Sequence, residues 1–145
     1  MVRLKLYSCS DGEVQEKSGL NWGHADAHVT TGDAYIPLPS SFFRDHPDFF
    51  PPQGNTITTI WDDKREIICL LEGTQDIGGI TYPKQISSAD DKSVIGEYLR
   101  KRLGVSRDCL ITKSDLSNYG RLDIEVSRRS TGEYYFDFSL PARLL

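Results

Sequence analysis

Hydrophobic side chains recur at every second residue along much of this chain, and this period limits the folds that it can adopt. Val2, Leu4 and Leu6 alternate with polar or charged residues, and residues 122–126 repeat the same pattern. A period of two puts one row of side chains on each face of a β-strand, whereas an amphipathic helix needs spacings of three and four. The sequence therefore predicts a mainly β protein.

Further strands are expected at 34–38, 56–61, 66–72 and 133–139. The charged segment 62–65 joins two of them as a hairpin, and a second hairpin ends in the last of these runs. Helices and strands do not alternate as they do in a parallel α/β sheet. We expect a mainly antiparallel barrel or sandwich of about seven strands.

Helical spacing is confined to short segments. Residues 93–103 carry an apolar stripe and stop at Gly104, and a shorter helix is expected to begin at 40–41. One further turn of helix is expected after Thr112. The basic run at 100–102 complements the dipole of its helix and is expected to form a solvated face. The fold class is thus β with two or three short helices.

Length and composition exclude several classes of protein. A chain of 145 residues has the length of one domain, and we expect a single domain over residues 1–145. No apolar run approaches the roughly 20 residues that cross a bilayer. Three cysteines without a close pair argue against a disulfide scaffold or a thiolate zinc site and favour a reducing cytosol. The net charge of −4 argues against a protein that coats nucleic acid regardless of sequence.

Two long polar segments interrupt the strand pattern. Residues 9–33 follow the first strand and residues 73–88 follow the fourth, and neither segment is expected to form strands. Connections in compact domains have a median of about 4–6 residues, and much longer ones are usually functional or disordered. Both segments carry aromatic and hydrogen-bonding side chains rather than a disordered composition. We therefore expect the working surface of the protein at these two loops.

The first loop concentrates side chains that can read the edges of DNA bases. Lysine donates to guanine, glutamine and asparagine pair with adenine, and carboxylates accept from cytosine. Ser18 and the glycines around it let the backbone approach phosphates. The second loop repeats this mixture at Gln75, Asp76 and 82–85. A structural loop would also be polar, and Trp22 would equally anchor the loop on the barrel.

A self-contained metal-dependent nuclease is the alternative function. Pro47-Asp48 and the later Asp62-Asp63-Lys64 match the skeleton of the PD-(D/E)xK nucleases, in which carboxylates hold a divalent metal beside the scissile phosphate. The second half of the motif lies at a predicted hairpin tip, where turns favour aspartate for their own geometry. A working site would need these side chains fixed along a strand.

Other chemistry finds little support in the sequence. His24, Asp26 and His28 offer a common metal-ligand set, but they fall in a loop without an evident fourth ligand, although His46 could join them. The chain has no nucleophile elbow, no phosphate-binding glycine loop and no dinucleotide fingerprint. We expect no metal and no cofactor. A protein-interaction or sugar-binding barrel is a third interpretation, and it predicts no binding to DNA.

Several stretches of the sequence resemble one known protein family. They are GEVQEKSGLNWG at 12–23, AYIPLPSS at 34–41, FFPPQG at 49–54, GEYLR at 96–100 and ITKSDL at 111–116. These stretches resemble the C-terminal region of phospholipase-D-type restriction endonucleases of the NgoFVII kind. The similarity runs nearly from end to end, over about residues 4–140.

This resemblance implies a fold and a function. The corresponding region of the family is a B3-like DNA-recognition domain, an open seven-stranded pseudobarrel in which two arms grip the major groove of a duplex. The N-arm would be residues 8–24 and the C-arm about residues 73–85, which are parts of the two loops described above. Family members read short GC-rich sites in double-stranded DNA.

The resemblance also implies that catalysis lies elsewhere. The catalytic half of such enzymes carries a His-x-Lys motif, which His24, His28 and His46 do not complete. We therefore expect a recognition domain excised from a larger enzyme of the bacterial cytoplasm. Its expected partners are double-stranded DNA, a covalently linked phospholipase-D-like nuclease domain and a helicase-like ATPase subunit, with no membrane partner.

The two arms and the strand before them supply the predicted site residues. Those expected to contact bases are Glu13, Gln15, Lys17, Asn21, Trp22, Gln75 and Asp76. Those expected to contact the DNA backbone or to support the arms are Lys5, Ser8, Ser10, Ser18, His24, Tyr82 and Lys84. No residue of this chain is assigned a catalytic role.

Overall fold

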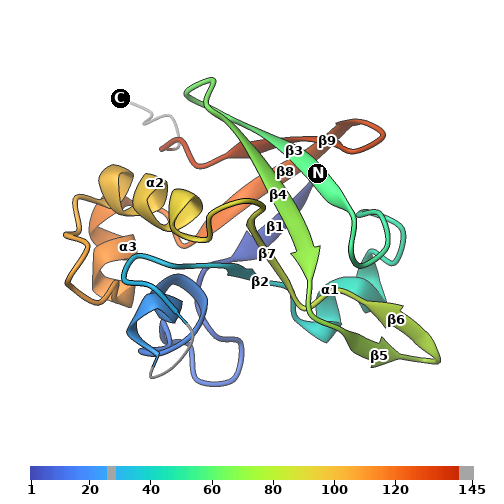
Figure 1. Cartoon of the computed structure of the whole chain (residues 1–145), viewed down its shortest axis with the longest axis horizontal. Coiled ribbons are helices and arrows are strands. Elements are labelled where there is room, and N and C mark those ends of the chain that lie inside the picture. The colour runs from blue at the N-terminus through green and yellow to red at the C-terminus, as the bar shows by residue number, and fades with distance from the viewer. Residues whose placement is uncertain (26–28, 141–145) are drawn as a thin grey trace, which may run out of the picture.

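One sheet of seven strands dominates the structure, a computed structural model that describes residues 1–25 and 29–140 (Figure 1). The sheet curls until its two edges face each other, which makes a nearly closed barrel with one open seam. In spatial order its strands are β1 (Val2–Lys5), β8 (Asp123–Ser130), β9 (Glu133–Asp137), β3 (Thr56–Trp61), β4 (Glu66–Glu72), β7 (Gln85–Ser88) and β2 (Ile36–Pro37). The predicted open pseudobarrel of seven strands with short helices is confirmed.

Neighbouring strands of this sheet pair antiparallel except for β3 and β9. Residues 58–61 of β3 run parallel to residues 133–136 of β9, so the sheet is mixed. Side chains alternate between the two faces in both kinds of ladder, and the sequence pattern therefore does not distinguish them. The strands β1 and β2 form the two edges that border the seam.

A separate two-stranded sheet projects from the barrel between β4 and β7. It consists of β5 (Gln75–Ile77) and β6 (Ile80–Tyr82). The strands β5, β6 and β7 all lie within residues 73–88, so the expectation that this segment forms no strands is wrong. Gly78 and Gly79 have φ angles of 60° and 85°, the left-handed values that a two-residue hairpin turn favours. Strands of three residues are too short to show a hydrophobic period.

Four short helical segments of the described chain pack around the barrel. They are the 3-10 helix η1 (Gly19–His24) and the α-helices α1 (Ser40–Asp45), α2 (Ser93–Leu103) and α3 (Lys113–Tyr119). The bounds of α2 agree with the prediction, and it ends at Gly104 with a φ angle of 73°. Helix α3 begins with a capping box between Thr112 and Asp115. None of the helices in these described ranges is long and apolar enough to cross a membrane.

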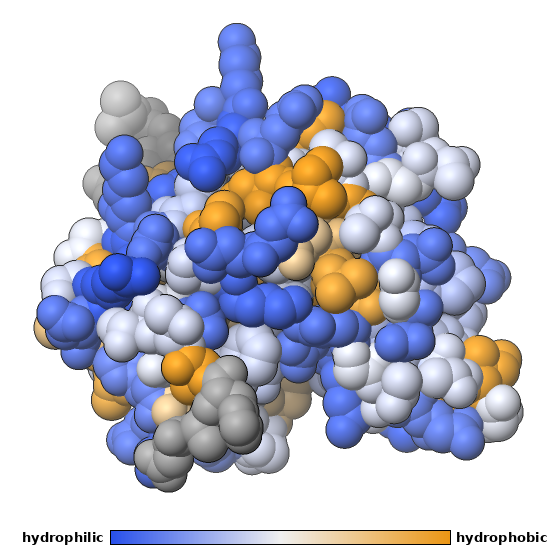
Figure 2. All heavy atoms as spheres, viewed as in Figure 1, coloured by the Kyte–Doolittle hydropathy of each residue, from blue (hydrophilic) through white to orange (hydrophobic). Residues whose placement is uncertain are grey.

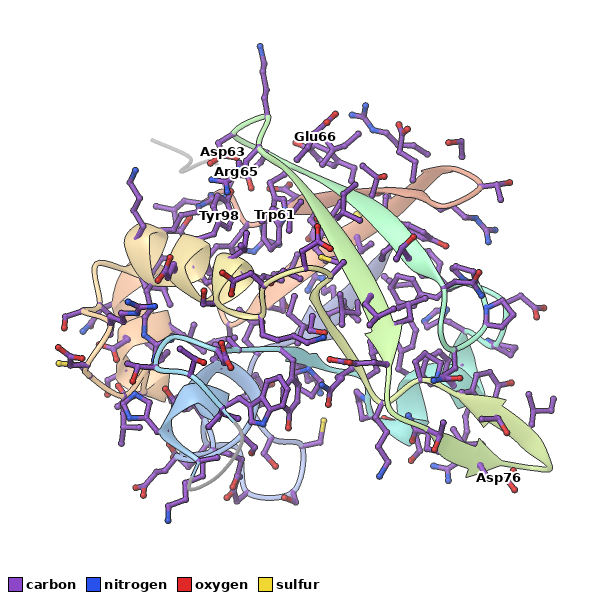
Figure 3. All side chains as sticks on the ribbon, viewed as in Figure 1. Trp61, Asp63, Arg65, Glu66, Asp76 and Tyr98 are labelled. Atoms are coloured by element: carbon purple, nitrogen blue, oxygen red, sulfur yellow. The ribbon has the colours of Figure 1, made fainter. Side chains whose placement is uncertain are left out.

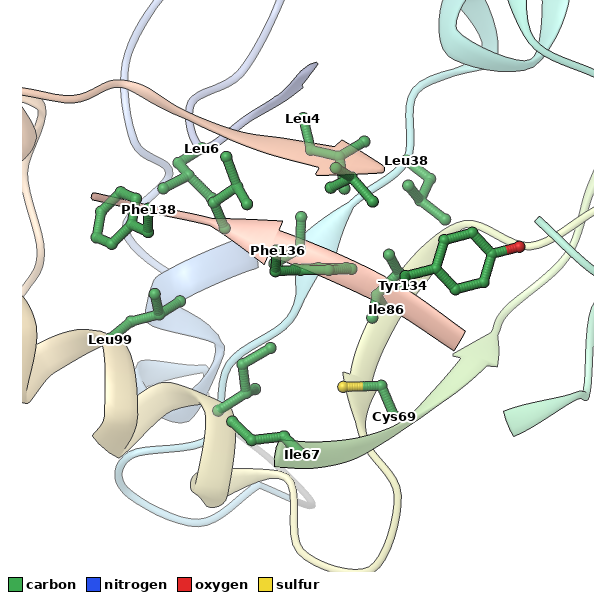
Figure 4. Close-up of a cluster of buried hydrophobic side chains, with 14 of the residues drawn as sticks. Leu4, Leu6, Leu38, Ile67, Cys69, Ile86, Leu99, Tyr134, Phe136 and Phe138 are labelled. Carbon is green, nitrogen blue, oxygen red and sulfur yellow. The ribbon is translucent and has the colours of Figure 1, made fainter. Parts of the chain in front are cut away.

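The barrel encloses a core of aromatic and aliphatic side chains (Figure 4). Trp61, Tyr134, Phe136 and Phe138 are almost fully buried in it. The indole N–H of Trp61 donates to Thr59 Oγ1 at 2.9 Å, so the only polar atom of this side chain has a partner. Burial raises the pKa of the Cys69 thiol to about 12, as is typical of an unreactive cysteine in an apolar core.

The basic run at the end of α2 does not form the solvated face that was predicted. Lys101 is exposed, but Arg100 is buried and the Arg102 side chain is only 15% exposed. Arg100 donates to oxygens of the first loop, and Arg102 forms an ion pair with Asp62 at 2.8 Å. These partners lie 40 to 80 residues away in the sequence, and local charge patterning therefore could not reveal them.

Candidate nucleic-acid interface

The two predicted arms project from the same end of the barrel. The N-arm, residues 8–24, follows β1, and the β5–β6 hairpin is the projecting part of the C-arm, residues 73–85. They lie at the lower left and lower right of Figure 1, and Figure 2 shows the surface indented between them. A cleft of about 450 Å³ opens there, lined by both arms and by residues of β1, β2 and β7. We call it the seam cleft.

The seam cleft gathers half of the predicted site residues. Those that line it are Lys5, Ser8, Ser10, Gln15, Ser18, Gln75 and Lys84. They come from β1 and the adjacent N-arm and from the C-arm, which begins more than 50 residues after Ser18. The open seam of the barrel therefore brings the two arms to one surface.

The seam cleft is positively charged although the chain as a whole is acidic. Lys5 and Lys84 line it, and none of its lining residues carries a carboxylate. The chain has 21 acidic and 17 basic residues, so this separation of charge is not a consequence of composition. Lys113 adds a further cation at the root of the N-arm, where its Nζ lies 5.6 Å from the ring centre of Tyr7. Such a surface suits a polyanion.

The tip of the N-arm is a network of exposed polar side chains. Ser8 Oγ lies 2.8 Å from Ser10 Oγ, and the amide of Gln15 donates to both carboxylate oxygens of Asp11 at 3.1 and 3.3 Å. The Glu13 N–H and the Gln15 amide hold the pKa of Asp11 below its ordinary value. The side chains of Glu13 and Gln15 are exposed, as a base contact requires.

Asn21 is placed differently from its prediction as a base contact. Its side chain is 1% exposed and makes four hydrogen bonds inside the protein. Its amide donates to the carbonyls of Gln15 and Ile111, and its oxygen accepts from the Ile111 N–H and from Arg100. Asn21 therefore holds the N-arm together and is withdrawn from the base-contacting set.

The other N-arm candidates lie at or near the surface. Lys17 is exposed, and Ser18 precedes η1 at its N-cap position. Trp22 packs edge-on against Tyr35 with ring centres 5.3 Å apart, which agrees with an anchoring role. His24 is partly buried, and its Nε2 has no hydrogen-bond partner in the described part of the chain.

The C-arm is fastened to the barrel at its base. The Gln75 amide donates to the carbonyls of Leu38 and Pro83, both at 2.8 Å, so both amide hydrogens are occupied by structural bonds. Tyr82 stacks on Phe43 of α1 with ring centres 4.6 Å apart, as expected of a supporting residue. Asp76 is exposed on the hairpin (Figure 3). Gln75 thus stabilises the arm, whereas Asp76, the other base contact predicted in the C-arm, is exposed to solvent.

Comparison with models of protein families identifies the domain. The model of the NgoFVII C-terminal B3-like DNA-binding domain matches residues 2–130, which is most of the chain. The chain belongs to this family. It is therefore a B3-like DNA-binding domain, related to the domain of a restriction enzyme. A search of curated proteins found no match.

The B3-like domain does not assemble the alternative nuclease motif. Both oxygens of Asp62 accept from the guanidinium of Arg102 at 2.8 Å, and one also accepts from the Phe138 N–H at 2.7 Å. Lys64 is exposed at the β3–β4 turn, and Asp48 is exposed beyond α1. Figure 3 shows that Asp63 and Arg65 of this turn lie at the opposite end of the molecule from Asp76. The carboxylate of Asp62 holds the fold together at a distance from the arms.

The B3-like domain brings no three potential metal ligands together within residues 1–25 and 29–140. Asp26 and His28 of the His-Ala-Asp-Ala-His sequence lie outside the described residues. The prediction that this chain needs no metal therefore stays a prediction.

Sequence patterns missed several residues of the B3-like domain that border the seam cleft. Tyr7 and Tyr35 line it, and so does Gln85, which the sequence indicated only as part of the polar mixture at 82–85 and to which no role was assigned. Tyr7 continues the outward-facing row of β1 after Lys5, and this alternation was a usable signal. Lys113 lies about 100 residues from the N-arm in sequence, and no local pattern connects the two.

Proposed function

We propose that this domain recognises a specific, short GC-rich sequence in double-stranded DNA by inserting the N-arm and the C-arm into the major groove. The observation that carries this proposal is the seam cleft, which both arms border and which has lysines but no carboxylate in its lining. A major groove about 12 Å wide admits an α-helix or a two-stranded β-ribbon. The β5–β6 hairpin is a ribbon of this kind, and the N-arm projects beside the same cleft.

The side chains divide into two roles. Phosphate contacts position a protein on the duplex, and base contacts provide specificity. We assign the base contacts to the exposed residues Glu13, Gln15, Lys17 and Asp76, with Trp22 beside them. The backbone contacts and arm support are assigned to Lys5, Ser8, Ser10, Ser18, His24, Tyr82 and Lys84. Carboxylates in the groove contribute discrimination for cytosine more than affinity, because phosphates repel them.

The proposed domain acts within a larger assembly. We propose that the parent protein is a restriction endonuclease of the bacterial cytoplasm, with a covalently linked phospholipase-D-like nuclease domain and a helicase-like ATPase subunit. This division assigns no catalysis and no cofactor to the present chain. Magnesium-dependent nicking of a supercoiled plasmid by the purified chain would contradict it.

Selection from a pool of random duplex DNA tests the proposal directly. We expect a short sequence to be enriched and its affinity to exceed that of unrelated DNA by about a thousandfold, the lower range for specific binders. Equal affinity for all duplexes would contradict sequence recognition. The absence of binding at every salt concentration would favour a protein-interaction or sugar-binding barrel instead.

Lys17→Ala is expected to weaken binding to the selected sequence by about tenfold, because a good base contact is worth roughly 1–3 kcal/mol. Binding to unrelated duplex DNA should change much less. Fluorescence anisotropy titrations with the two DNA molecules measure this difference. Lys101→Ala is the matched control, since Lys101 is exposed on α2 and does not line the seam cleft. Equal losses on both DNA molecules would place Lys17 at the phosphates.

A further inference from the structure

A buried polar node connects the N-arm to helix α2. Asn21 donates to the Gln15 carbonyl and to the Ile111 carbonyl, both at 2.8 Å. Its oxygen accepts from the Ile111 N–H at 2.8 Å and from Arg100 Nη2 at 3.2 Å. The backbone of Gln15, an exposed residue of the proposed reading surface, is therefore fixed from the interior of the protein.

Arg100 is an unusual residue at the centre of this node. It is 2% exposed, and its guanidinium donates to the carbonyls of Leu20 and Cys109 as well as to Asn21. Within the described residues these partners are neutral oxygens rather than carboxylates, and its Nε has no partner. A buried cation without a counter-ion is a poor source of stability, because desolvation opposes its burial. Its planar guanidinium instead fixes the positions of three oxygen atoms, each from a different residue, relative to α2.

The backbone packing around α2 shows that the following part of the first loop is seated there too. A Cβ atom on Gly96 of α2 would lie 2.0 Å from the carbonyl oxygen of Gly32, and one on Gly23 would lie 2.6 Å from the Gly32 nitrogen. Only glycine allows backbones to approach so closely. Arg107, beyond the end of α2, donates to the Thr31 carbonyl at 3.1 Å. Helix α2 and the segment after it thus form a platform for the first loop.

We propose that Arg100 is a positioning residue for DNA recognition, which acts through Asn21 to hold the N-arm in one conformation before DNA arrives. This inference rests on the proposed reading role of the N-arm. A preset arm loses less conformational entropy on binding than a mobile one, and its side chains meet the base edges in one register. Arg100 touches no DNA, and its effect is confined to sequences that the arm reads.

The test is a double-mutant cycle between Arg100→Met and Gln15→Ala, measured on the selected DNA and on unrelated DNA. Arg100→Met is expected to weaken binding to the selected DNA by about tenfold and to leave unrelated binding and its salt dependence nearly unchanged. Gln15→Ala should weaken selective binding in the unsubstituted chain and have little further effect beside Arg100→Met. Amide hydrogen exchange should accelerate in residues 15–21 but not in β3 and β4, a local change that general destabilisation would not produce.

Lys101→Met is the matched control, because it removes a neighbouring exposed cation from the same helix. If Arg100→Met binds the selected DNA as the unsubstituted chain does, while Gln15→Ala weakens it, the positioning role is refuted and the proposed function stands. Equal losses on both DNA molecules would also refute it.

If no sequence is selected, or if Gln15→Ala does not change binding of the selected DNA in the unsubstituted chain, the proposed reading role of the N-arm is itself refuted. Should Arg100→Met not fold, Arg100→Lys is measured in its place, since lysine keeps the charge but lacks the planar set of donors.

Discussion

Asp62→Ala is expected to lower the free energy of unfolding by about 3 kcal/mol, the size of effect seen when one partner of a buried ion pair is removed. The Asp62 and Arg102 side chains are 12% and 15% exposed, so the change leaves a largely buried guanidinium without its carboxylate. It also removes the acceptor of the Phe138 N–H. Arg102 also donates to the Tyr119 hydroxyl and the Phe138 carbonyl. The guanidinium thus links the end of β3 with α2, α3 and the segment after β9.

Urea unfolding measures this change, with Asp108→Ala as the control. Asp108 is exposed in the segment between α2 and α3, where a surface substitution is expected to stay within about 0.5 kcal/mol. A loss below about 1 kcal/mol for Asp62→Ala would show that the ion pair contributes little. Loss of magnesium-dependent cleavage in a stable variant would instead support the nuclease alternative.

The Asp62–Arg102 ion pair also makes the free energy of unfolding depend on pH. Burial acts to raise the pKa of Asp62, but the hydrogen bonds and charge of Arg102 outweigh it and hold the pKa below the ordinary value of 3.8. Because the unfolded chain then binds the proton more readily, the contribution of Asp62 is complete above pH 3.8 and is lost as the pH falls below it. Urea unfolding between pH 5 and pH 3 should therefore show a steeper decline for the unsubstituted chain than for Asp62→Ala. Parallel declines would contradict the shift.

Replacing Lys5 and Lys84 together by glutamine is expected to weaken binding to every duplex, by about 50-fold at 0.1 M salt. Both lysines line the seam cleft and are exposed, so each can neutralise a phosphate. Each phosphate contact contributes about 0.9 to the slope of log K against log salt concentration, and the slope should fall by about 1.8. Selectivity between the selected and unrelated sequences should persist, because these contacts do not distinguish bases.

The control for this pair is the double substitution of Lys64 and Lys101 by glutamine. It changes the net charge equally, but both residues are exposed outside the seam cleft. Titrations between 50 and 300 mM salt give the two slopes. If the control lowers affinity as much as the cleft pair does, overall charge rather than the seam cleft attracts DNA. An unchanged slope for the cleft pair would remove both lysines from the phosphate contacts.

Most of the barrel could be predicted from local pattern. The strands at 56–61 and 66–72 and the helix at 93–103 agree with their predicted bounds, because each has a clear period and a clear stop. The strands β5 and β6 were missed, since three residues on each side of Gly78-Gly79 show no period. The parallel pairing of β3 and β9 could not be predicted from local pattern either, because it joins segments more than 70 residues apart.

The site was predicted less evenly than the fold. The length, composition and family resemblance of the two long loops predict that they form the working surface, and in the structure residues of both line the seam cleft. That DNA binds at this cleft stays a prediction. Among the individual residues, Asn21 and Gln75 have the same amide chemistry as Gln15, and the sequence predicts the same role for all three. In the structure the amides of Asn21 and Gln75 donate to backbone carbonyls at the base of the arms, whereas Gln15 is exposed and its amide bonds the exposed carboxylate of Asp11.

Hydrophobic period, turns and helix stops are local properties of neighbouring residues, and from them the sequence predicts a mainly antiparallel β fold, either a barrel or a sandwich, with two long polar segments. Which loop side chains face the seam cleft and which are buried depends on contacts that form only in the folded protein. The burial of Asn21 depends on Arg100 and Ile111, and that of the Arg102 charge depends on Asp62. These partners are 40 to 90 residues apart in the sequence and come into contact only in the folded protein, so no local sequence pattern predicts their pairing.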